Sequence, residues 1–283
     1  QDVTPLVIEK YYRDLLNTDS VGNKIFKTKK KVSTGTIKQI HKYLKCAFGV
    51  ALKWDLIAKN PLLSVEPPKH VYKKREIWTS EMIVQALREC EEPKLAIAIH
   101  LSFACSLRLG ELLGLRWKDV HISDEDIMKD DAHIYVNCEL AKVSLKALKA
   151  LNEKDVIFTF PQNIPNKVYK TTTVLKKPKT ESSIRKIWLP KTLAFILREW
   201  KEEQEKYKEF FGDEYNDYDL VICFEDGRYC SHNVIRNALK SVTEVAGLPP
   251  IVFHSFRHSS TTYKLKLNHG DIKATQGDTG HSQ

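Results

Sequence analysis

The sequence predicts a mainly α-helical protein with a small antiparallel β-sheet, an α+β fold. Three observations predict it. Apolar residues recur at helical spacing near both ends of the chain, β-branched and aromatic residues gather in the middle, and a proline-rich basic stretch interrupts the pattern near residue 70. A length of 283 residues with 42% hydrophobic residues allows one large domain or two, each with its own core.

The N-terminal region is expected to form two helices. Thr4 and Pro5 supply an N-cap and a proline at the first helical position, which predicts a helix over residues 4–16. A longer helix is expected over residues 34–58, with an apolar face formed by Ile37, Ile40, Leu44, Ala47, Phe48 and Ala51. The opposite face is either a solvated surface or a row of contacts to DNA phosphates; it carries Lys38, Lys42, Lys45 and Lys53.

A linker is expected over residues 60–76, "NPLLSVEPPKHVYKKRE", which contain three prolines and a basic cluster but no periodicity. The domain boundary is therefore placed near residue 70, between a domain of residues 1–70 and a domain of residues 71–283. No internal repeat is found.

The second domain is expected to begin with a helix at Thr79 or Ser80. The stretch "KLAIAIHLSFACSLRLGELLGLRW" predicts a largely apolar helix, a turn and a second helix. Strands are expected over residues 133–140, 171–177 and 183–190, and the last two are expected to form a small antiparallel sheet across the turn "PKTES". From Lys191 the pattern is helical again, interrupted by the loop "FEDGRYCS".

Composition favours some partners and compartments over others. The formal charge of +9 favours polyanionic partners, although a soluble basic protein without such a partner has the same balance. The six cysteines lack C-x-x-C or zinc-like spacing, so we expect reduced thiols in a cytoplasmic protein and no metal site. No apolar run approaches the roughly 18 residues of a membrane helix, and the N-terminus lacks the apolar core of a signal peptide.

Two histidines and an arginine lie close together in "HSFRH", residues 254–258. On a helix His254, Arg257 and His258 share one face, and we expect this face to point away from the core contacted by Phe253, Phe256, Tyr263 and Leu267. Histidine titrates near neutral pH, and arginine matches two oxygens of a phosphate or carboxylate. The spacing alone could be coincidental.

Three further residues are candidates for chemistry. Arg108 lies between two apolar helices, three residues before Glu111, where it either pairs with that carboxylate to hold the turn or binds an anion. Lys179 lies in the expected turn and is either an exposed turn residue or functional. His281 follows Gly280 near the end of the sequence.

In their order along the chain, these stretches resemble the tyrosine-type site-specific recombinases, the phage and mobile-element integrase family. The resemblance covers nearly the whole chain. The family's first arginine element matches residues 106–111, with Ser106 in place of the usual glycine, and its β-turn lysine matches Lys179. Its His-x-x-Arg element matches His254 and Arg257, and its Leu-Gly-His element matches residues 279–281 with threonine in place of leucine.

The resemblance implies a helical core-type DNA-binding domain and linker over residues 1–70, lacking the family's first helix, and an integrase-type catalytic domain over residues 71–283. In the family the nucleophilic tyrosine follows the Gly-His element. Here the sequence stops at Gln283, and none of its eleven tyrosines occupies that place. We therefore expect a chain truncated before its nucleophile, and a start at Gln1 suggests a portion of a longer protein.

The resemblance also implies roles for these residues. Arg108, Arg257 and His281 would stabilise charge on the reacting phosphate, Lys179 would be the general acid, and His254 would accept the tyrosine proton. The family cuts and rejoins DNA through a 3′-phosphotyrosine without metal, ATP or other cofactor. The expected partners are double-stranded DNA at attachment sites and further copies of the protein, as a tetramer on paired sites in the cytoplasm of a bacterial host. His258 is not required by the family pattern.

Three other interpretations remain open from the sequence. A non-catalytic site-specific DNA-binding fragment, or degenerate integrase, would share everything except the nucleophile. A type IB topoisomerase shares the active-site chemistry, although the short helical domain fits an integrase better. A phosphohydrolase that uses histidine and arginine has no metal ligands or phosphate loop to support it.

Overall fold

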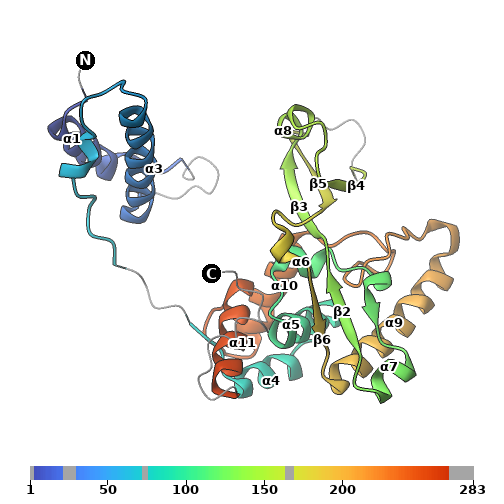
Figure 1. The fold of residues 1–283 in the computed structure, drawn as a ribbon. Coiled ribbons are helices and arrows are strands. Elements are labelled where there is room, and N and C mark those ends of the chain that lie inside the picture. The colour runs from blue at the N-terminus through green and yellow to red at the C-terminus, as the bar shows by residue number, and fades with distance from the viewer. Residues whose placement is uncertain (1–2, 22–29, 72–75, 163–168, 268–283) are drawn as a thin grey trace. The chain divides into compact units, whose positions relative to one another are not determined.

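The computed structural model describes residues 3–21, 30–71, 76–162 and 169–267 (Figure 1). The chain divides into two compact units, residues 1–74 and residues 75–283. Each unit has its own hydrophobic core. No helix in the described part of the chain is long and apolar enough to cross a membrane.

The N-terminal unit packs α1 (Pro5–Asn17) and α3 (Thr34–Lys53) against the short 3₁₀ helix η1 (Pro61–Ser64). Both expected helices are present, and side chains cap their first turns: Thr4 accepts from the backbone of Val7, and Ser33 accepts from that of Thr36. The core contains Ile8, Tyr12, Ile37, Leu62 and Val65. The second helix ends before the expected residue 58, because Asp55 adopts a left-handed conformation with φ 54°.

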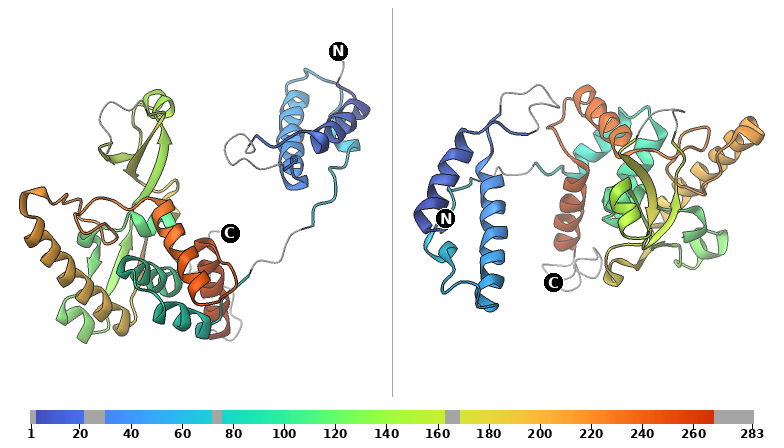
Figure 2. Two further views of the ribbon diagram at one scale, coloured as in Figure 1. Left: turned by 180° about the vertical axis from the view of Figure 1, so that it is seen from behind. Right: turned by 90° about the horizontal axis from the view of Figure 1, so that it is seen from above.

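The C-terminal unit is organised around α5. Its helices are α4 (Ser80–Arg88), α5 (Pro93–Cys105), α6 (Leu109–Leu113), α7 (Asp124–Met128), α8 (Leu145–Ala150), α9 (Lys191–Phe211), α10 (His232–Val245) and α11 (Phe253–Leu267), with 3₁₀ segments η2 (Trp117–Asp119), η3 (Glu181–Ser183) and η4 (Gly212–Glu214). α5 is apolar on all sides and contacts α4, α6, α9, α10 and α11. Figure 2 shows this helical layer from two further sides.

In the described residues of the C-terminal unit, two three-stranded antiparallel sheets accompany the helices, so the predicted fold class is confirmed. One has the order β1-β2-β6, formed by β1 (Val120–His121), β2 (His133–Val136) and β6 (Arg185–Trp188). The other has the order β3-β5-β4, formed by β3 (Glu139–Ser144), β5 (Thr171–Lys176) and β4 (Val156–Thr159). The second sheet projects from the helical body together with α8 (Figure 1).

The expected pairing of the last two strands across the turn is wrong. β5 pairs with β3, with Glu139 opposite Lys176, and β6 pairs with β2, with Val136 opposite Arg185. β2 and β3 follow one another along the chain, and β6 and β5 pair with them in turn. Residues 177–184 therefore form a loop that connects the end of β5, beside β3, to the start of β6, beside β2. We call this segment the 177–184 loop. It is longer than the tight turns that join directly paired strands.

Candidate active site

The turn between α5 and α6 positions Arg108. α5 ends at Cys105, and Ser106 turns the chain in a left-handed conformation with φ 53°. Arg108 is the N-cap of α6, and Glu111 accepts from its backbone N–H at 3.0 Å. The same carboxylate pairs with the Arg108 guanidinium, with 2.6 Å between Nη1 and Oε1. Glu111 therefore fixes both the backbone and the side chain of Arg108.

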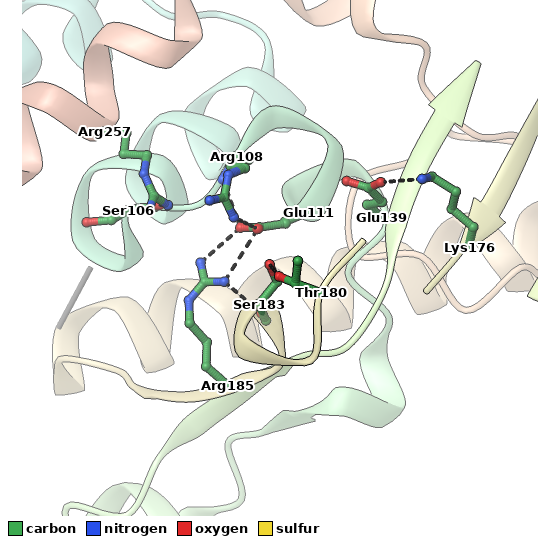
Figure 3. A network of polar contacts seen from close by, with 9 residues as sticks. All are labelled: Ser106, Arg108, Glu111, Glu139, Lys176, Thr180, Ser183, Arg185 and Arg257. Atoms are coloured by element: carbon green, nitrogen blue, oxygen red, sulfur yellow. Dashed lines mark hydrogen bonds and ion pairs between the residues drawn. The ribbon is translucent and has the colours of Figure 1, made fainter. Parts of the chain in front are cut away.

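Glu111 also binds a second arginine from β6, Arg185. The distance from Arg185 Nη2 to Glu111 Oε2 is 2.9 Å, and Arg185 Nη1 donates to the carbonyl of Ser183 at 3.0 Å (Figure 3). Burial by itself raises the pKa of Glu111, but the hydrogen bonds and charges of Arg185 and Arg108 outweigh it and hold the pKa below its ordinary value. Glu111 is therefore an ionised carboxylate at neutral pH.

Arg257 reaches the same turn from α11. Its Nη1 donates to the carbonyl of Ser106 at 2.6 Å, and the residue is only 2% exposed. Burial, together with repulsion from Arg108, lowers the pKa of Arg257 to about 10, so the guanidinium remains cationic at neutral pH. Figure 3 shows Arg257 reaching from its own helix toward the turn that carries Arg108.

The expectation that the cationic face of α11 points away from the core is wrong for Arg257. Arg257 points inward because its guanidinium donates to the carbonyl of Ser106, and Ser106 is buried as well. α11 packs against α5, and its residues Ser255, Ser259 and Ser260 are also buried. His254 is exposed and His258 is half-buried; their rings contact edge to face, with centroids 4.8 Å apart. The Tyr263 ring contacts that of Phe103, but Tyr263 is 43% exposed, so the expectation that it contacts the core together with Phe253 and Phe256 is wrong.

The site carries an excess of positive charge. Three arginines meet at the α5–α6 turn: Arg108 and Arg185 pair with the Glu111 carboxylate, and Arg257 donates to the Ser106 carbonyl. The Arg108 side chain is 44% exposed and lines a groove of about 650 Å³, which Lys142, His232 and Arg236 also line. Burial and the neighbouring Arg236 lower the pKa of His232, so the basic wall of this groove comes from arginine and lysine. An anion that enters the groove meets Arg108.

Lys179 is exposed in the 177–184 loop. The structure does not place its amine against the arginines, but it does tie its loop to them, because Arg185 binds both Glu111 and the Ser183 carbonyl. Arg185 was not singled out from the sequence. The available signal was a charged residue within the expected strand "SIRKIWLP".

The remaining sequence-based candidates lie elsewhere. His281 lies outside the described residues. Lys38, Lys42, Lys45 and Lys53 are all exposed on α3, and the first three line a shallow hollow with His41 and Pro67. The six cysteines are free thiols. In the part of the chain that the structure describes, no group of three or more histidine, cysteine, aspartate or glutamate side chains is arranged to hold a metal ion.

Comparison with known proteins defines the class to which this site belongs. Residues 78–283 match the model of the phage integrase family. The chain therefore belongs to the phage integrase family, and the resemblance seen in the sequence motifs is confirmed.

Two curated relatives extend the similarity into the N-terminal unit. A "Tyrosine recombinase XerC-like" protein of Caldanaerobacter subterraneus subsp. tengcongensis is 26% identical and aligns with 99% of this chain. The ICEBs1 integrase of Bacillus subtilis is 24% identical and aligns with 88% of this chain. The alignments cover 64% and 62% of these relatives, so this chain corresponds to less than two thirds of their length.

Solved structures share the fold. The Tn1549 transposon integrase, solved in complex with a circular intermediate DNA, aligns over 100% of this chain and 78% of its own with a TM-score of 0.71 and 17% identity. A lambda integrase dimer bound to a COC′ core site aligns over 100% of this chain and 62% of its own, with a TM-score of 0.55 and 16% identity.

Proposed function

We propose that this chain is the DNA-binding and strand-transfer portion of a site-specific recombinase that integrates or excises a mobile element. The observation that carries the proposal is the convergence of Arg108 and Arg257 on one turn, in a chain of the phage integrase family. Two preorganised guanidinium groups suit the charge that develops on the non-bridging oxygens of a phosphodiester under attack.

The proposed reaction transfers a DNA phosphodiester to a tyrosine hydroxyl and conserves the bond as a 3′-phosphotyrosine. Arg108 and Arg257 bind the phosphate, with His281 as a further donor. Lys179 protonates the departing 5′-oxygen, and His254 accepts the proton of the tyrosine. The contacts at the turn support the arginine assignments, whereas the other three follow the family motif.

The substrate proposed is double-stranded DNA at the ends of a mobile element. Solved relatives include the Tn1549 integrase with circular intermediate DNA and a lambda integrase tetramer bound to a Holliday junction. By analogy, residues 1–70 and 71–283 act as two DNA-binding domains, four copies assemble on paired sites, and the protein works in the cytoplasm of a bacterial host. The exposed lysines of α3, Lys38, Lys42, Lys45 and Lys53, contact phosphates in this proposal.

The test is covalent adduct formation. This chain and the product of its gene read to the stop codon are each incubated with nicked duplexes from the ends of the parent element, and adducts are separated on a denaturing gel. We expect an adduct with the longer protein only. Arg257→Ala should abolish it, and Arg257→Lys or Arg108→Lys should reduce it roughly 10²-fold, because a point charge does not reproduce the bidentate fork. A salt-sensitive gel shift without any adduct would instead identify a DNA-binding protein that does not cleave.

A further inference from the structure

We infer that Arg185 is a positioning residue that holds the 177–184 loop against the arginine-bearing turn and thereby sets the position of Lys179. The inference rests on the proposed function, in which Lys179 is the general acid. Arg185 is the first residue of β6, directly after the 177–184 loop, and pairs with Val136 of β2. Its guanidinium joins three segments: its own strand, the Ser183 carbonyl of the loop, and Glu111 of α6.

The contact of Arg185 with Glu111 is buried. The two side chains are 11% and 2% exposed, so solvent screens their interaction poorly. Arg185 Nη1 lies 3.0 Å from the Ser183 oxygen and 3.4 Å from Glu111 Oε1, and its Nη2 lies 2.9 Å from Glu111 Oε2. The planar fork therefore binds the carboxylate with both terminal nitrogens and the loop with one of them, an arrangement that a lysine cannot reproduce.

A second ion pair closes the other end of the loop. Lys176 at the end of β5 pairs with Glu139 of β3 at 2.8 Å, and both side chains are 28% exposed (Figure 3). Pairs with this much solvent access contribute less than buried ones. The Lys176 side chain is thus a weak attachment of the 177–184 loop, beside a backbone hydrogen bond from Lys177 N–H to the Asp155 carbonyl at 2.8 Å, and Arg185 is a strong side-chain attachment. Removal of the strong attachment should release the exposed Lys179.

The position of Lys179 matters for one bond in the proposed step. The tyrosine oxygen forms a bond to phosphorus, the bond between phosphorus and the 5′-oxygen breaks, and the electron pair stays on that oxygen. The oxygen takes a proton from the Lys179 ammonium, which becomes an amine. If sulfur replaces the bridging 5′-oxygen, the leaving thiolate departs with its electron pair and needs no proton, because thiols are far stronger acids than alcohols.

This difference separates the proposed role of Arg185 from support of the arginines alone. The product of the gene read to its stop codon is tested on nicked duplexes with a 5′-oxygen or a 5′-bridging sulfur at the cleavage site. We expect Arg185→Gln to slow adduct formation roughly 10²-fold on the oxygen substrate, as loss of a general acid does, and to react within about threefold of the unsubstituted protein on the sulfur substrate. Lys179→Ala should show the same pattern, and Arg185→Lys should lie between.

Two matched variants test specificity. Arg116→Gln removes another arginine–carboxylate pair, in which Arg116 binds Asp119 and both side chains are 12% exposed; Arg116 also donates to Asn137. This variant should react at the unsubstituted rate on both substrates. Lys176→Gln removes the weaker attachment and should slow the oxygen reaction less than Arg185→Gln does. An Arg185→Gln protein that is equally slow on both substrates, or fast on both, would overturn the inference.

A second readout does not depend on catalysis. In the present chain, amide hydrogen exchange of residues 177–184 should be faster in Arg185→Gln than in Arg116→Gln, while exchange in α5 stays unchanged. If the unsubstituted gene product, read to its stop codon, forms no adduct on either substrate, the proposed function fails. Amide hydrogen exchange alone then tests whether Arg185 positions the 177–184 loop. Unchanged exchange in the 177–184 loop would then reject that role as well.

Discussion

At the scale of single residues, Glu111 determines how the arginines are arranged. It is 3% exposed, accepts from the backbone N–H of Arg108 at the N-cap of α6, and accepts hydrogen bonds from two guanidinium groups that come from different elements. Its pKa lies below the ordinary value because Arg185 and Arg108 stabilise the carboxylate more than burial destabilises it. The folded protein therefore prefers the ionised form of Glu111 more strongly than the unfolded chain does.

The pH dependence of stability should reveal this preference. A depressed pKa contributes stability that is fully present above the ordinary value of 4.5 and is lost as the pH falls through the folded pKa. Glu111→Gln should lower the unfolding free energy by about 3 kcal/mol at pH 7, and the difference from the unsubstituted protein should narrow toward pH 3. Urea unfolding followed by tryptophan fluorescence measures it. A difference that stays constant from pH 7 to pH 3 would contradict the assignment.

Ser106 occupies the position where the family motif usually has glycine. Its φ of 53° is unfavourable for a residue with a side chain, but its hydroxyl lies 2.6 Å from that of Ser260 in compensation. Ser106→Ala keeps the strain and loses the hydrogen bond, whereas Ser106→Gly loses both. We expect the alanine variant to be less stable than the glycine variant by about 1 kcal/mol in urea unfolding. An alanine variant at least as stable as the glycine variant would refute this account.

At the scale of elements, close packing of α6 on β3 fixes where the site lies relative to the sheet. A Cβ added at Gly114, the C-cap of α6, would approach the backbone nitrogen of Leu140 to 2.8 Å and the carbonyl carbon of Glu139 to 2.9 Å. Backbone atoms of a paired strand cannot move aside as a flexible side chain can. Only glycine therefore allows this approach of helix and strand.

Gly114→Ala should accordingly destabilise the C-terminal unit by about 1 to 3 kcal/mol, because the helix must move away from the strand. Gly49→Ala in α3 is the matched control: its added Cβ would meet only Asn60 Nδ2 at 3.8 Å, and alanine is favoured inside a helix. Thermal unfolding of both variants measures the difference. Equal melting temperatures for the two variants would show that the contact tolerates a methyl group.

At the scale of the whole molecule, the excess of basic residues over acidic ones should govern DNA affinity. The formal charge is +9, and Lys38, Lys42 and Lys45 are exposed around one hollow on α3. Each lysine that contacts a phosphate releases counterions from DNA, so binding weakens as salt rises. These contacts are expected to be independent of base sequence.

Replacement of these three lysines by glutamine should reduce the slope of log affinity against log salt by roughly 2 to 3, at about 0.9 for each lost phosphate contact. Lys10→Gln, an exposed lysine on α1 of the same unit, should leave the slope within about 0.5 of the original. Gel shifts or fluorescence anisotropy across a salt series provide the measurement. An unchanged slope in the triple variant would assign the α3 lysines to solvated surface instead.

The sequence by itself determined the fold class, most helix starts and the family. Caps such as Thr4 and Thr79 and the spacing of apolar residues act within a few positions, so they can be read without knowledge of distant contacts. The family motifs that contain Arg108 and Arg257 were also evident, because each is a short run of residues and they occur along the sequence in the family's order.

Only the tertiary structure decided how distant segments meet. It paired β5 with β3 instead of β6, brought Arg257 to the carbonyl of Ser106, and brought Arg185 to Glu111. Strand partners and buried ion pairs depend on which residues of separate segments come into contact, and many pairings satisfy the same local pattern. In the folded chain, the Glu111 carboxylate binds Arg108 and Arg185, and the Ser106 carbonyl binds Arg257. Local periodicity could not have predicted that these three arginines meet.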